Sequence, residues 1–509
     1  MSSADWPDHL ARLRQSRAAA RTVRPGQAER AAARGRLLCR DRLQALLDPG
    51  SFVETGVLAG SVLDEVDAPA DGLVCGSGAI DGRPVFVAAD DGSYFSGARG
   101  LSAERKLSRL RRRAVAEGCP FIWLQEGSGA RIQEQMGARF AGAFAEPFLE
   151  QVRLMTGRIP TIAALLGNCF GQPAFIAALA DFAVMTRTAL TGVSGPPVIA
   201  AATGEQVSAQ ALGGWEVHSR VTGLVDCVTV DEPAAFAAIR RYLSFFPSNS
   251  ALPPPRAATA DAGGDQAELT RLVPTDLKLA YDMTRVLRVI ADRDSLLELK
   301  PEFGAAVITA WARVGGFPVG IIASQPRHAG GALDPCAADK IADFIEVADA
   351  YQLPLVFLQD VPGFLVGTQM EHEGQVVRAT RVLKVLAQSS TAKFTVILRK
   401  AYGLAYMVMC GAPMQPRSIV AWPTASISQM GPGPGVNVIF HRELAAAADR
   451  EATRGELEKA FEKLLDPYIA ARQALIDDII DPAETRGHLI AELAGAHRAW
   501  RPRSGGAQQ

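Results

Sequence analysis

The sequence lacks several features that would assign a function class directly. Its 53 basic and 54 acidic residues leave a formal net charge of −1, so no global charge attracts nucleic acid or an anionic membrane surface. No apolar stretch reaches the roughly 20 residues needed to cross a bilayer, and the first forty residues contain no apolar core of a signal peptide. We therefore expect a soluble, cytoplasmic protein.

Cysteine and histidine are few and scattered. The seven cysteines include no CxxC pair and the seven histidines show no ligand spacing, which predicts reduced thiols and no metal site. A GxxxxGK[ST] loop and an HExxH motif are also missing. The stretches GSGAID (76–81) and GPGPG (431–435) do not fit a dinucleotide-binding turn, because the first precedes a strand and the second has prolines where a helix start needs donors.

What the chain does contain is a regular alternation of strand-length apolar runs with helix-length segments, which predicts an α/β protein with parallel strands buried on both faces. The order of these runs occurs twice. The matched stretches are DGRPVFVAA (81–89) with GGFPVGIIA (315–323), GCPFIWLQEGSGAR (118–131) with QLPLVFLQDVPGF (352–364), and IPTIAALLGNCFGQPAF (159–175) with AKFTVILRKAYGLAYMV (392–408).

The offset between the two copies is nearly constant along the chain. It is the same from Pro84 to Pro318 as from Glu126 to Asp360, and it is almost the same from Gly171 to Gly403. This period is far longer than the repeat of a solenoid, so each copy is long enough to be a whole domain. The repeat therefore indicates two tandem domains of like fold.

A segment rich in Pro, Ala, Gly and Ser separates the two repeats, and PSNSALPPPRAATADAGGDQAE (247–268) has the composition of an exposed linker. We therefore predict an N-terminal domain over residues 1–250, a linker over 251–268 and a C-terminal domain over 269–500. The tail RPRSGGAQQ (501–509) is predicted to be disordered.

Each repeat ends two apolar strands in a glycine-containing turn. A strand that passes through such a turn into a helix presents backbone N–H groups suited to negative charge. Two of these turns side by side would form an oxyanion hole for the enolate of a thioester, without any titratable side chain. The alternative, that the glycines only permit close packing of helix on strand, stays open for any single turn.

The sequence contains two clusters of charged residues. The stretch ARGLSAERKLSRLRRR (98–113) has helical spacing and is either a solvated helix face or a docking site for polyphosphate. The acidic and histidine side chains after the strand LPLVFLQ (353–359) are interpreted as a solvated loop; they are Asp360, Glu371, His372 and Glu373.

Together, several motifs resemble those of one known family, the carboxyltransferase (β) subunits of biotin-dependent acyl-CoA carboxylases of the propionyl-CoA carboxylase β-chain type. The similar segments extend over nearly the whole chain. They include CRDRLQALLDPGSFVE (39–54), GARIQE (129–134), GEQVSAQALGG (204–214), DVPGFLVGTQMEHEG (360–374), RKAYGLAY (399–406) and MGPGPGVNVIF (430–440).

The resemblance implies two crotonase-like domains of the ClpP/crotonase superfamily and a homohexamer built as a trimer of dimers. It also implies that acyl-CoA binds mainly to the first domain and carboxybiotin to the second. The carboxyl group then leaves N1′ of biotin, and the ureido oxyanion removes the α-proton of the acyl-CoA, whose enolate captures the CO₂. Since the chain has no biotinylation motif and no ATP-binding module, a separate biotin carboxylase and biotin carrier are implied as partners.

Carried over by position, the resemblance places the oxyanion hole for the thioester at Gly171 and Gln172 and that for biotin at Gly403 and Leu404. The family usually has paired glycines at both places, so Gln172 and Leu404 are departures from it. Because of these departures, two further hypotheses stay open. The chain could be a biotin-independent or atypical decarboxylase of malonyl-type or methylmalonyl-type CoA, or a non-catalytic paralogue that pairs with an active subunit.

Further binding residues follow from the same resemblance. The GSGAR stretch (127–131) contributes Gly129 and Ala130, and the second glycine turn is followed by Tyr406 and Met407, where Met407 occupies a position linked to acyl-chain preference. For the CoA phosphates the charge and the family's placement of CoA indicate Arg99, Arg105 and Lys106.

Overall fold

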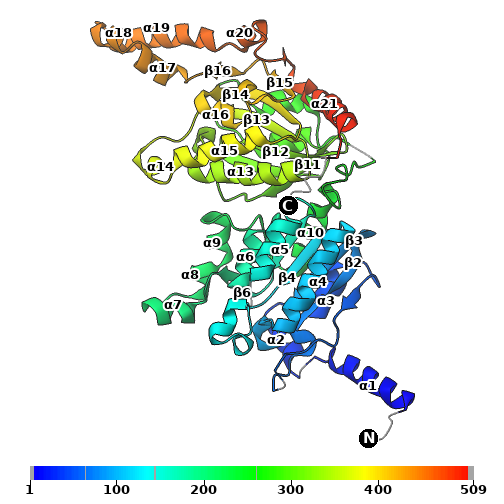
Figure 1. Ribbon diagram of the computed structural model, residues 1–509. Helices are drawn as coiled ribbons and strands as arrows, with labels where there is room; N and C mark the ends of the chain where they lie inside the picture. Colours follow the sequence, from blue (N-terminus) through cyan, green and yellow to red (C-terminus); the bar gives the residue numbers. More distant parts are fainter. Residues whose placement is uncertain (1–4, 24, 64, 143–144, 259–260, 503–509) are drawn as a thin grey trace. The chain divides into compact units, whose positions relative to one another are not determined.

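The structure is a computed structural model that describes residues 5–23, 25–63, 65–142, 145–258 and 261–502. The chain divides into two compact units, unit 1 over Met1–Leu252 and unit 2 over Pro253–Gln509. Each unit is a sheet flanked by helices (Figure 1).

The sheet of unit 1 has seven strands in the order β1–β2–β3–β4–β5–β7–β9. Their bounds are β1 (Val53–Thr55), β2 (Leu73–Ile80), β3 (Arg83–Asp90), β4 (Phe121–Gln125), β5 (Thr161–Leu165), β7 (Phe182–Thr186) and β9 (Cys227–Thr229). The pairs β1–β2 and β2–β3 are antiparallel and the remaining pairs are parallel. A separate parallel pair joins β6 (Asn168–Phe170) to β8 (Leu190–Gly192).

The sheet of unit 2 repeats this arrangement in the order β10–β11–β12–β13–β14–β15–β17. Its strands are β10 (Leu297–Leu299), β11 (Val307–Val314), β12 (Phe317–Ser324), β13 (Leu355–Val361), β14 (Lys393–Tyr402), β15 (Ser418–Ala421) and β17 (Asp478–Ile479). The far end of β14 also pairs with β16 (Ser426–Ser428). The first two pairs are again antiparallel and the others parallel.

The helices of unit 1 are α1 (Trp6–Ala19), α2 (Gln27–Ala33), α3 (Cys39–Leu46), α4 (Leu101–Glu117), α5 (Ala145–Glu150), α6 (Gln172–Ala178), α7 (Pro196–Thr203), α8 (Ala209–Gly213), α9 (Trp215–Arg220) and α10 (Glu232–Phe245). Those of unit 2 are α11 (Leu269–Leu272), α12 (Met283–Ile290), α13 (Pro335–Ala350), α14 (Thr368–His372), α15 (Gln375–Gln388), α16 (Gly403–Val408), α17 (Pro432–Ile439), α18 (His441–Ala446), α19 (Arg450–Glu462), α20 (Pro467–Arg472) and α21 (Thr485–Ala499). The helices α13 and α15 lie side by side on the sheet of unit 2 (Figure 1).

The internal repeat is visible in the positions of the elements. The strands β12, β13 and β14 follow one another in unit 2 as β3, β4 and β5 do in unit 1, and α13 takes the place of α4 between the first two of them. All residues of β4 and β5 are buried, as the uninterrupted apolar runs predict. The α/β class with two tandem units of like fold is therefore confirmed.

The described part of the predicted linker (251–268) is mostly exposed or half-buried, and within it only Pro254 is buried. From Pro253 onward this segment belongs with unit 2, where the N–H of Ala257 donates to the carbonyl of Gly316 at 2.9 Å and Arg313 donates to the carbonyl of Pro255 at 2.7 Å. The turn between β11 and β12 offers these groups, and the proline-rich segment packs onto it. Of the predicted disordered tail, residues 503–509 lie outside the described part of the chain.

The same buried lysine occurs in both units. Lys106 of α4 donates to the carbonyl of Leu73, the first residue of β2, and Lys340 of α13 donates at 2.7 Å to the carbonyl of Val307, the first residue of β11. The two lysines and their two acceptors match one another at the offset of the internal repeat. Each ammonium group thus ties the long helix to the start of the same strand of its sheet.

We expect Lys340 to make stability depend on pH. Burial lowers the pKa of Lys340 to about 7, although nearby Glu298 acts in the opposite direction. The pKa of an unfolded lysine is about 10.4, so between these values only the unfolded state binds the proton, and the free energy of unfolding should rise with pH by up to about 1.4 kcal/mol per pH unit from this group. The Lys340→Met variant should lose this slope in urea titrations between about pH 7 and 10, whereas Lys459→Met, outside the core, should keep it. An unchanged slope in Lys340→Met would contradict the assignment.

Candidate functional site

The glycine turn of unit 1 lies between β6 and α6. Gly171 has a φ of 75°, in the left-handed region that side chains other than that of glycine rarely adopt. Its N–H donates to the carbonyl of Gly192 in β8 at 2.9 Å. Of the two predicted oxyanion donors the Gly171 N–H is therefore already bonded, while the N–H of Gln172, the first residue of α6, has no acceptor within its helix.

The turn after β4 meets this turn at Gln172. A Cβ added to Gly129 would lie 3.7 Å from the backbone N of Gln172 and 4.0 Å from its Cβ. The Gln172 side chain is 9% exposed, and its amide nitrogen and oxygen are buried without a hydrogen-bond partner among the described residues. Gly129 and Gln172, predicted separately from two segments, are thus brought together, with Ala130 half-buried beside them.

The turn after β4 in unit 1 and the turn after β13 in unit 2 are held in the same way. In unit 1 the N–H of Arg99 donates to the carbonyl of Gly129 at 2.9 Å, and in unit 2 the N–H of Leu333 donates to the carbonyl of Gly363 at 3.0 Å. Donors and acceptors match at the offset of the internal repeat. Gly363 and the following Phe364 are therefore the unit 2 counterparts of Gly129 and Ala130, which the sequence reasoning missed although the repeat offset points to them.

The second predicted glycine turn lies where β14 enters α16. Gly403 is the first residue of the helix and has a φ of 61°, and a Cβ on it would lie 3.0 Å from the carbonyl oxygen of Gln429. The N–H groups at a helix start have no acceptor within the helix and carry the positive end of its dipole. The Leu404 side chain beside them is 62% exposed.

Tyr406 and Met407 follow on α16, and both are half-buried. The hydroxyl of Tyr406 accepts a hydrogen bond from the N–H of Ala412 at 2.8 Å, and its ring packs so closely against Gly411 that a Cβ there would lie 2.5 Å from it. Burial raises the pKa of Tyr406, so the phenol is neutral. The ring thus supports the turn from within the fold, and contact of Tyr406 or Met407 with a ligand stays a prediction.

The three basic residues predicted to bind phosphates lie in different environments. Arg99 is 1% exposed and its guanidinium is 3.1 Å from Asp90 and 3.4 Å from Glu104. Lys106 is 6% exposed and bonded to backbone carbonyls, whereas Arg105 is exposed. The amphipathic character of α4 explains the difference, because every third or fourth side chain faces the core. Of the three cations only Arg105 has a charge available at the surface.

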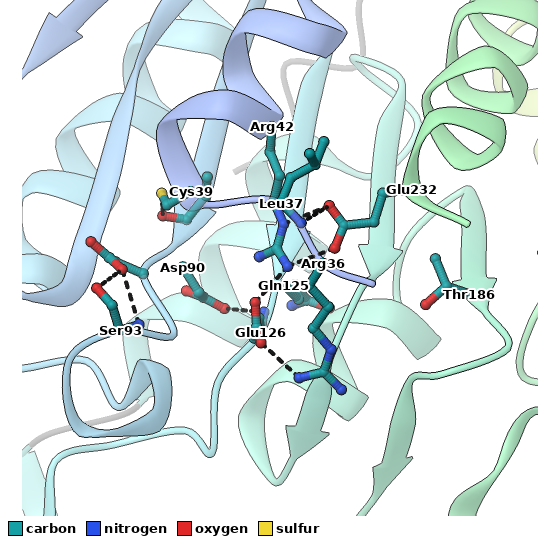
Figure 2. A network of polar contacts seen from close by, with 12 residues as sticks. Arg36, Leu37, Cys39, Arg42, Asp90, Ser93, Gln125, Glu126, Thr186 and Glu232 are labelled. Atoms are coloured by element: carbon teal, nitrogen blue, oxygen red, sulfur yellow. Dashed lines mark hydrogen bonds and ion pairs between the residues drawn. The ribbon is translucent and has the colours of Figure 1, made fainter. Parts of the chain in front are cut away.

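A network of arginines and carboxylates lies at the carboxyl ends of β3 and β4 (Figure 2). Glu126 pairs with Arg36 at 2.8 Å and with Arg42 at 2.5 Å, and Arg42 also pairs with Glu232 at 2.7 Å. The N–H of Glu126 donates to the buried carboxylate of Asp90 at 3.2 Å, and burial raises the pKa of Asp90. Because each carboxylate of this network has cationic or N–H partners, we assign the network to holding the strand ends rather than to proton transfer.

The counterpart of Glu126 in unit 2 is Asp360, and its environment corrects the predicted solvated loop. Asp360 lies within β13, is 0% exposed, and pairs with Arg399 at 2.9 Å and Lys400 at 3.4 Å. Only the later members of that cluster, residues 371–373 on and after α14, are exposed. The strand β13 continues two residues beyond the apolar run, which is why Asp360 is buried.

Metal-binding clusters and membrane-spanning helices are both absent from the described residues. No group of three or more His, Cys, Asp or Glu side chains in these ranges could hold a metal ion, and the seven cysteines are free. Within the same ranges no helix is long and apolar enough to traverse a bilayer.

Comparison with known proteins relates the chain to a family. A family model described as the carboxyl transferase domain matches residues 30–504. The chain is 38% identical over 487 residues to the methylmalonyl-CoA carboxyltransferase 12S subunit of Propionibacterium freudenreichii subsp. shermanii, covering 93% of this chain and 91% of the relative. It is 36% identical over 481 residues to the propionyl-CoA carboxylase beta chain of Saccharopolyspora erythraea, covering 91% and 88%.

Two further similarities are relevant to the reaction and to the fold. The methylmalonyl-CoA decarboxylase subunit alpha of Propionigenium modestum is 36% identical over 470 residues, covering 91% of this chain and 90% of the relative. Among solved structures, the transcarboxylase 12S hexamer with methylmalonyl-CoA and methylmalonic acid bound superposes with a TM-score of 0.93 at 35% identity, covering 100% of this chain and 98% of that one.

Proposed function

This chain belongs to the carboxyl transferase family as the carboxyltransferase subunit of a biotin-dependent acyl-CoA carboxylase. We propose that it moves a carboxyl group from carboxybiotin to the α-carbon of an acyl-CoA, and that backbone N–H groups hold the enolate formed on the way. The observation that supports this mechanism most is the meeting of two glycine turns at the N–H of Gln172 in unit 1, together with the matching pair of turns in unit 2.

In unit 1 the proposed acceptor of these N–H groups is the thioester oxygen of acyl-CoA. Loss of the α-proton puts negative charge on that oxygen, and a fixed backbone donor stabilises it by about 10²–10³ in rate. The N–H of Gln172 is aimed out of its helix, and the missing side chain at Gly129 leaves room beside it. We place the CoA phosphates near Arg105, since the charges of Arg99 and Lys106 are compensated inside the fold.

In unit 2 we propose that the corresponding turns hold the ureido ring of biotin. A Cβ at Gly363 would meet nothing within 4 Å, and Gly403 offers an N–H at the start of α16. Biotin supplies the carboxyl group and a ureido oxygen that becomes anionic when the carboxyl group leaves. The part of this chain is to orient the ring at Gly363 and to donate hydrogen bonds from Gly403 and Leu404 to that oxygen.

The remaining elements of the proposal concern assembly. We propose a homohexamer, a trimer of dimers, that works in the cytoplasm with a separate biotin carboxylase and a biotin carrier protein. The support is the hexamer of the 12S relative, the absence of a biotinylation motif in the sequence, and the free cysteines of the described residues.

The reverse reaction tests the function. Purified protein is incubated with malonyl-CoA or methylmalonyl-CoA, with and without free biotin or a biotinylated carrier, and loss of the carboxyl group is followed. We expect loss that requires biotin. Loss of equal rate without biotin would favour a decarboxylase acting alone, and no turnover with any CoA ester and carrier would favour a non-catalytic paralogue.

The decarboxylase alternative is supported by two observations. One is the similarity to a methylmalonyl-CoA decarboxylase subunit, and the other is the exposed Leu404 side chain at the turn proposed for biotin. A side chain there restricts the backbone and the space that a paired glycine would leave.

The side chain of Gln172 provides a second test of the site. Its buried amide lacks a hydrogen-bond partner among the described residues, at a typical cost of about 1–3 kcal/mol, so replacing it should relieve this penalty while adding backbone freedom. We expect Gln172→Gly to keep its melting temperature within a few degrees but to change kcat or KM for the acyl-CoA several-fold. Gln172→Leu, which keeps the volume without the amide, is the matched control. Unchanged kinetics in both variants would place the side chain away from the thioester.

A further inference from the structure

Unit 2 contains a cavity at the end of its sheet opposite to the proposed transfer site. The cavity has a volume of about 280 Å³ and lies at the amino ends of three parallel strands, next to Phe317 in β12, Pro354 before β13 and Ala392 before β14. The end of α21 and the following Trp500 form its other wall. The whole length of β14 separates this cavity from Gly403, so the cavity is distinct from the turns assigned to biotin.

The corresponding place in unit 1 is crossed by the chain itself. There the segment 246–250, directly after α10, crosses the amino ends of the strands, and the side-chain amide of Asn249 donates to the carbonyl of Gly118 at 3.0 Å. The internal repeat matches Gly118 with Gln352, which lines the cavity of unit 2. In unit 1 the chain itself therefore occupies part of the place that corresponds to the cavity.

Two buried hydrogen-bond donors in the cavity wall have no partner. The side-chain nitrogen of Gln352 and the indole nitrogen of Trp500 are buried and make no hydrogen bond among the described residues. Both atoms only donate. Leaving a buried donor unpaired typically costs about 1–3 kcal/mol, so such groups point to a partner that supplies oxygen acceptors.

The charges around the cavity have one sign. Arg417 and Arg501 line it, and no residue with a carboxylate is found among the described lining residues. Arg417 is 3.4 Å from Glu492, which does not line the cavity, and its side chain is 45% exposed. Arg501 donates to the carbonyls of Arg498 and Trp500, and it forms no ion pair with a carboxylate among the described residues. An anion is therefore favoured over a cation or a neutral molecule.

Much of the remaining wall is apolar, and Ser390, Thr391 and His497 add polar groups to it. Pro254, Phe317 and Leu493 contribute carbon surface. A cavity of about 150 Å³ can hold one benzene ring, so 280 Å³ offers room for a body of about two fused rings. The wall thus combines apolar surface with donors and positive charge at its edge.

We propose that this cavity binds a small organic carboxylate with a compact apolar body, whose oxygens accept hydrogen bonds from Gln352, Trp500 and Arg417. The site lies apart from the acyl-CoA and biotin turns and does not depend on the proposed carboxyl transfer. Binding there satisfies the two orphaned donors.

The test uses 2-naphthoate as the probe and 2-naphthalenemethanol as its neutral counterpart of similar size, with the full-length protein in its native assembly. Isothermal titration should give one saturable naphthoate site per chain and at least about tenfold weaker binding of the alcohol. Arg417→Gln should weaken naphthoate binding about tenfold or more, while Arg472→Gln, a variant of the same unit outside the cavity, should not. Naphthoate should also change the tryptophan fluorescence of the wild-type protein but not that of Trp500→Phe.

Three results would overturn the proposal: no saturable naphthoate binding, equal binding of acid and alcohol, or unchanged binding in both Arg417→Gln and Trp500→Phe. Circular dichroism checks that each variant is folded. If Arg417→Gln does not fold, the naphthoate binding of Trp500→Phe tests the proposal. Since every readout is binding rather than turnover, failure here and failure of the carboxyltransferase assay are distinguishable.

Discussion

Replacing Gly403 by alanine should lower the rate of carboxyl transfer from carboxybiotin about 10²–10³-fold, the usual effect of removing one oxyanion donor. The residue has a φ of 61°, and an added Cβ would come 3.0 Å from the carbonyl oxygen of Gln429. Alanine at such an angle is strained, and the contact forces the first turn of α16 to shift. The N–H groups of Gly403 and Leu404 would then be displaced from the orientation that we propose for binding the ureido oxygen.

The measurement is steady-state transfer with a biotinylated carrier, accompanied by a thermal melt. Gly455→Ala is the matched control, because a Cβ at Gly455 in α19 would meet nothing within 4 Å. The control should keep full activity, and Gly403→Ala should lose activity with a melting temperature lowered by only a few degrees. Full activity in Gly403→Ala would remove this turn from the mechanism.

The largest expected effect on stability follows from Arg399. This side chain is 0% exposed, pairs with Asp360 at 2.9 Å, and donates to the carbonyls of Pro274, Asp276 and Leu279 at 2.8–3.0 Å. Arg399→Met removes all of these donors at once and leaves Asp360 with Lys400 at 3.4 Å as its remaining cation. Removing one partner of a buried pair typically costs about 3–5 kcal/mol, and we expect at least that loss in unit 2.

Hydrogen exchange can follow this effect locally. In Arg399→Met the amides of residues 273–281 and of the end of β14 should exchange much faster, and the urea midpoint of unit 2 should fall. Arg381→Met is the matched control, because Arg381 pairs with Asp343 and Glu346 at partly exposed sites, where ion pairs contribute about 0–1 kcal/mol. Similar losses in both variants would mean that the Arg399 contacts contribute little.

Most of the fold could be predicted from sequence because its signals are local and repeated. Uninterrupted apolar runs such as FIWLQ and TIAAL are long enough to identify buried parallel strands, and their return at a nearly constant offset indicates a second copy. The contacts of the segment 251–268 could not be predicted in this way. Its composition is that of a linker, but the carbonyls and N–H groups it binds belong to the distant hairpin of β11 and β12, and no local pattern reports such contacts.

The candidate site could likewise be predicted from the sequence only in part. The turns at Gly171 and Gly403 could be found because the glycines and the lengths of the preceding strands can be identified directly in the amino-acid sequence. The burial of Arg99 and Lys106 could not, since whether a basic side chain faces solvent depends on which carboxylates and carbonyls the fold brings to it. Gly363 was accessible through the repeat and was missed, because the motif around it carries different letters from those around Gly129.

Lys106 and Lys340 carry information about the origin of the chain. The two halves differ in most strand residues, yet in each a buried lysine of the long helix binds the first carbonyl of the same strand. Duplication of a half-length ancestral gene would produce this pattern. Descent in two copies preserves what each half requires in order to fold and lets the rest diverge.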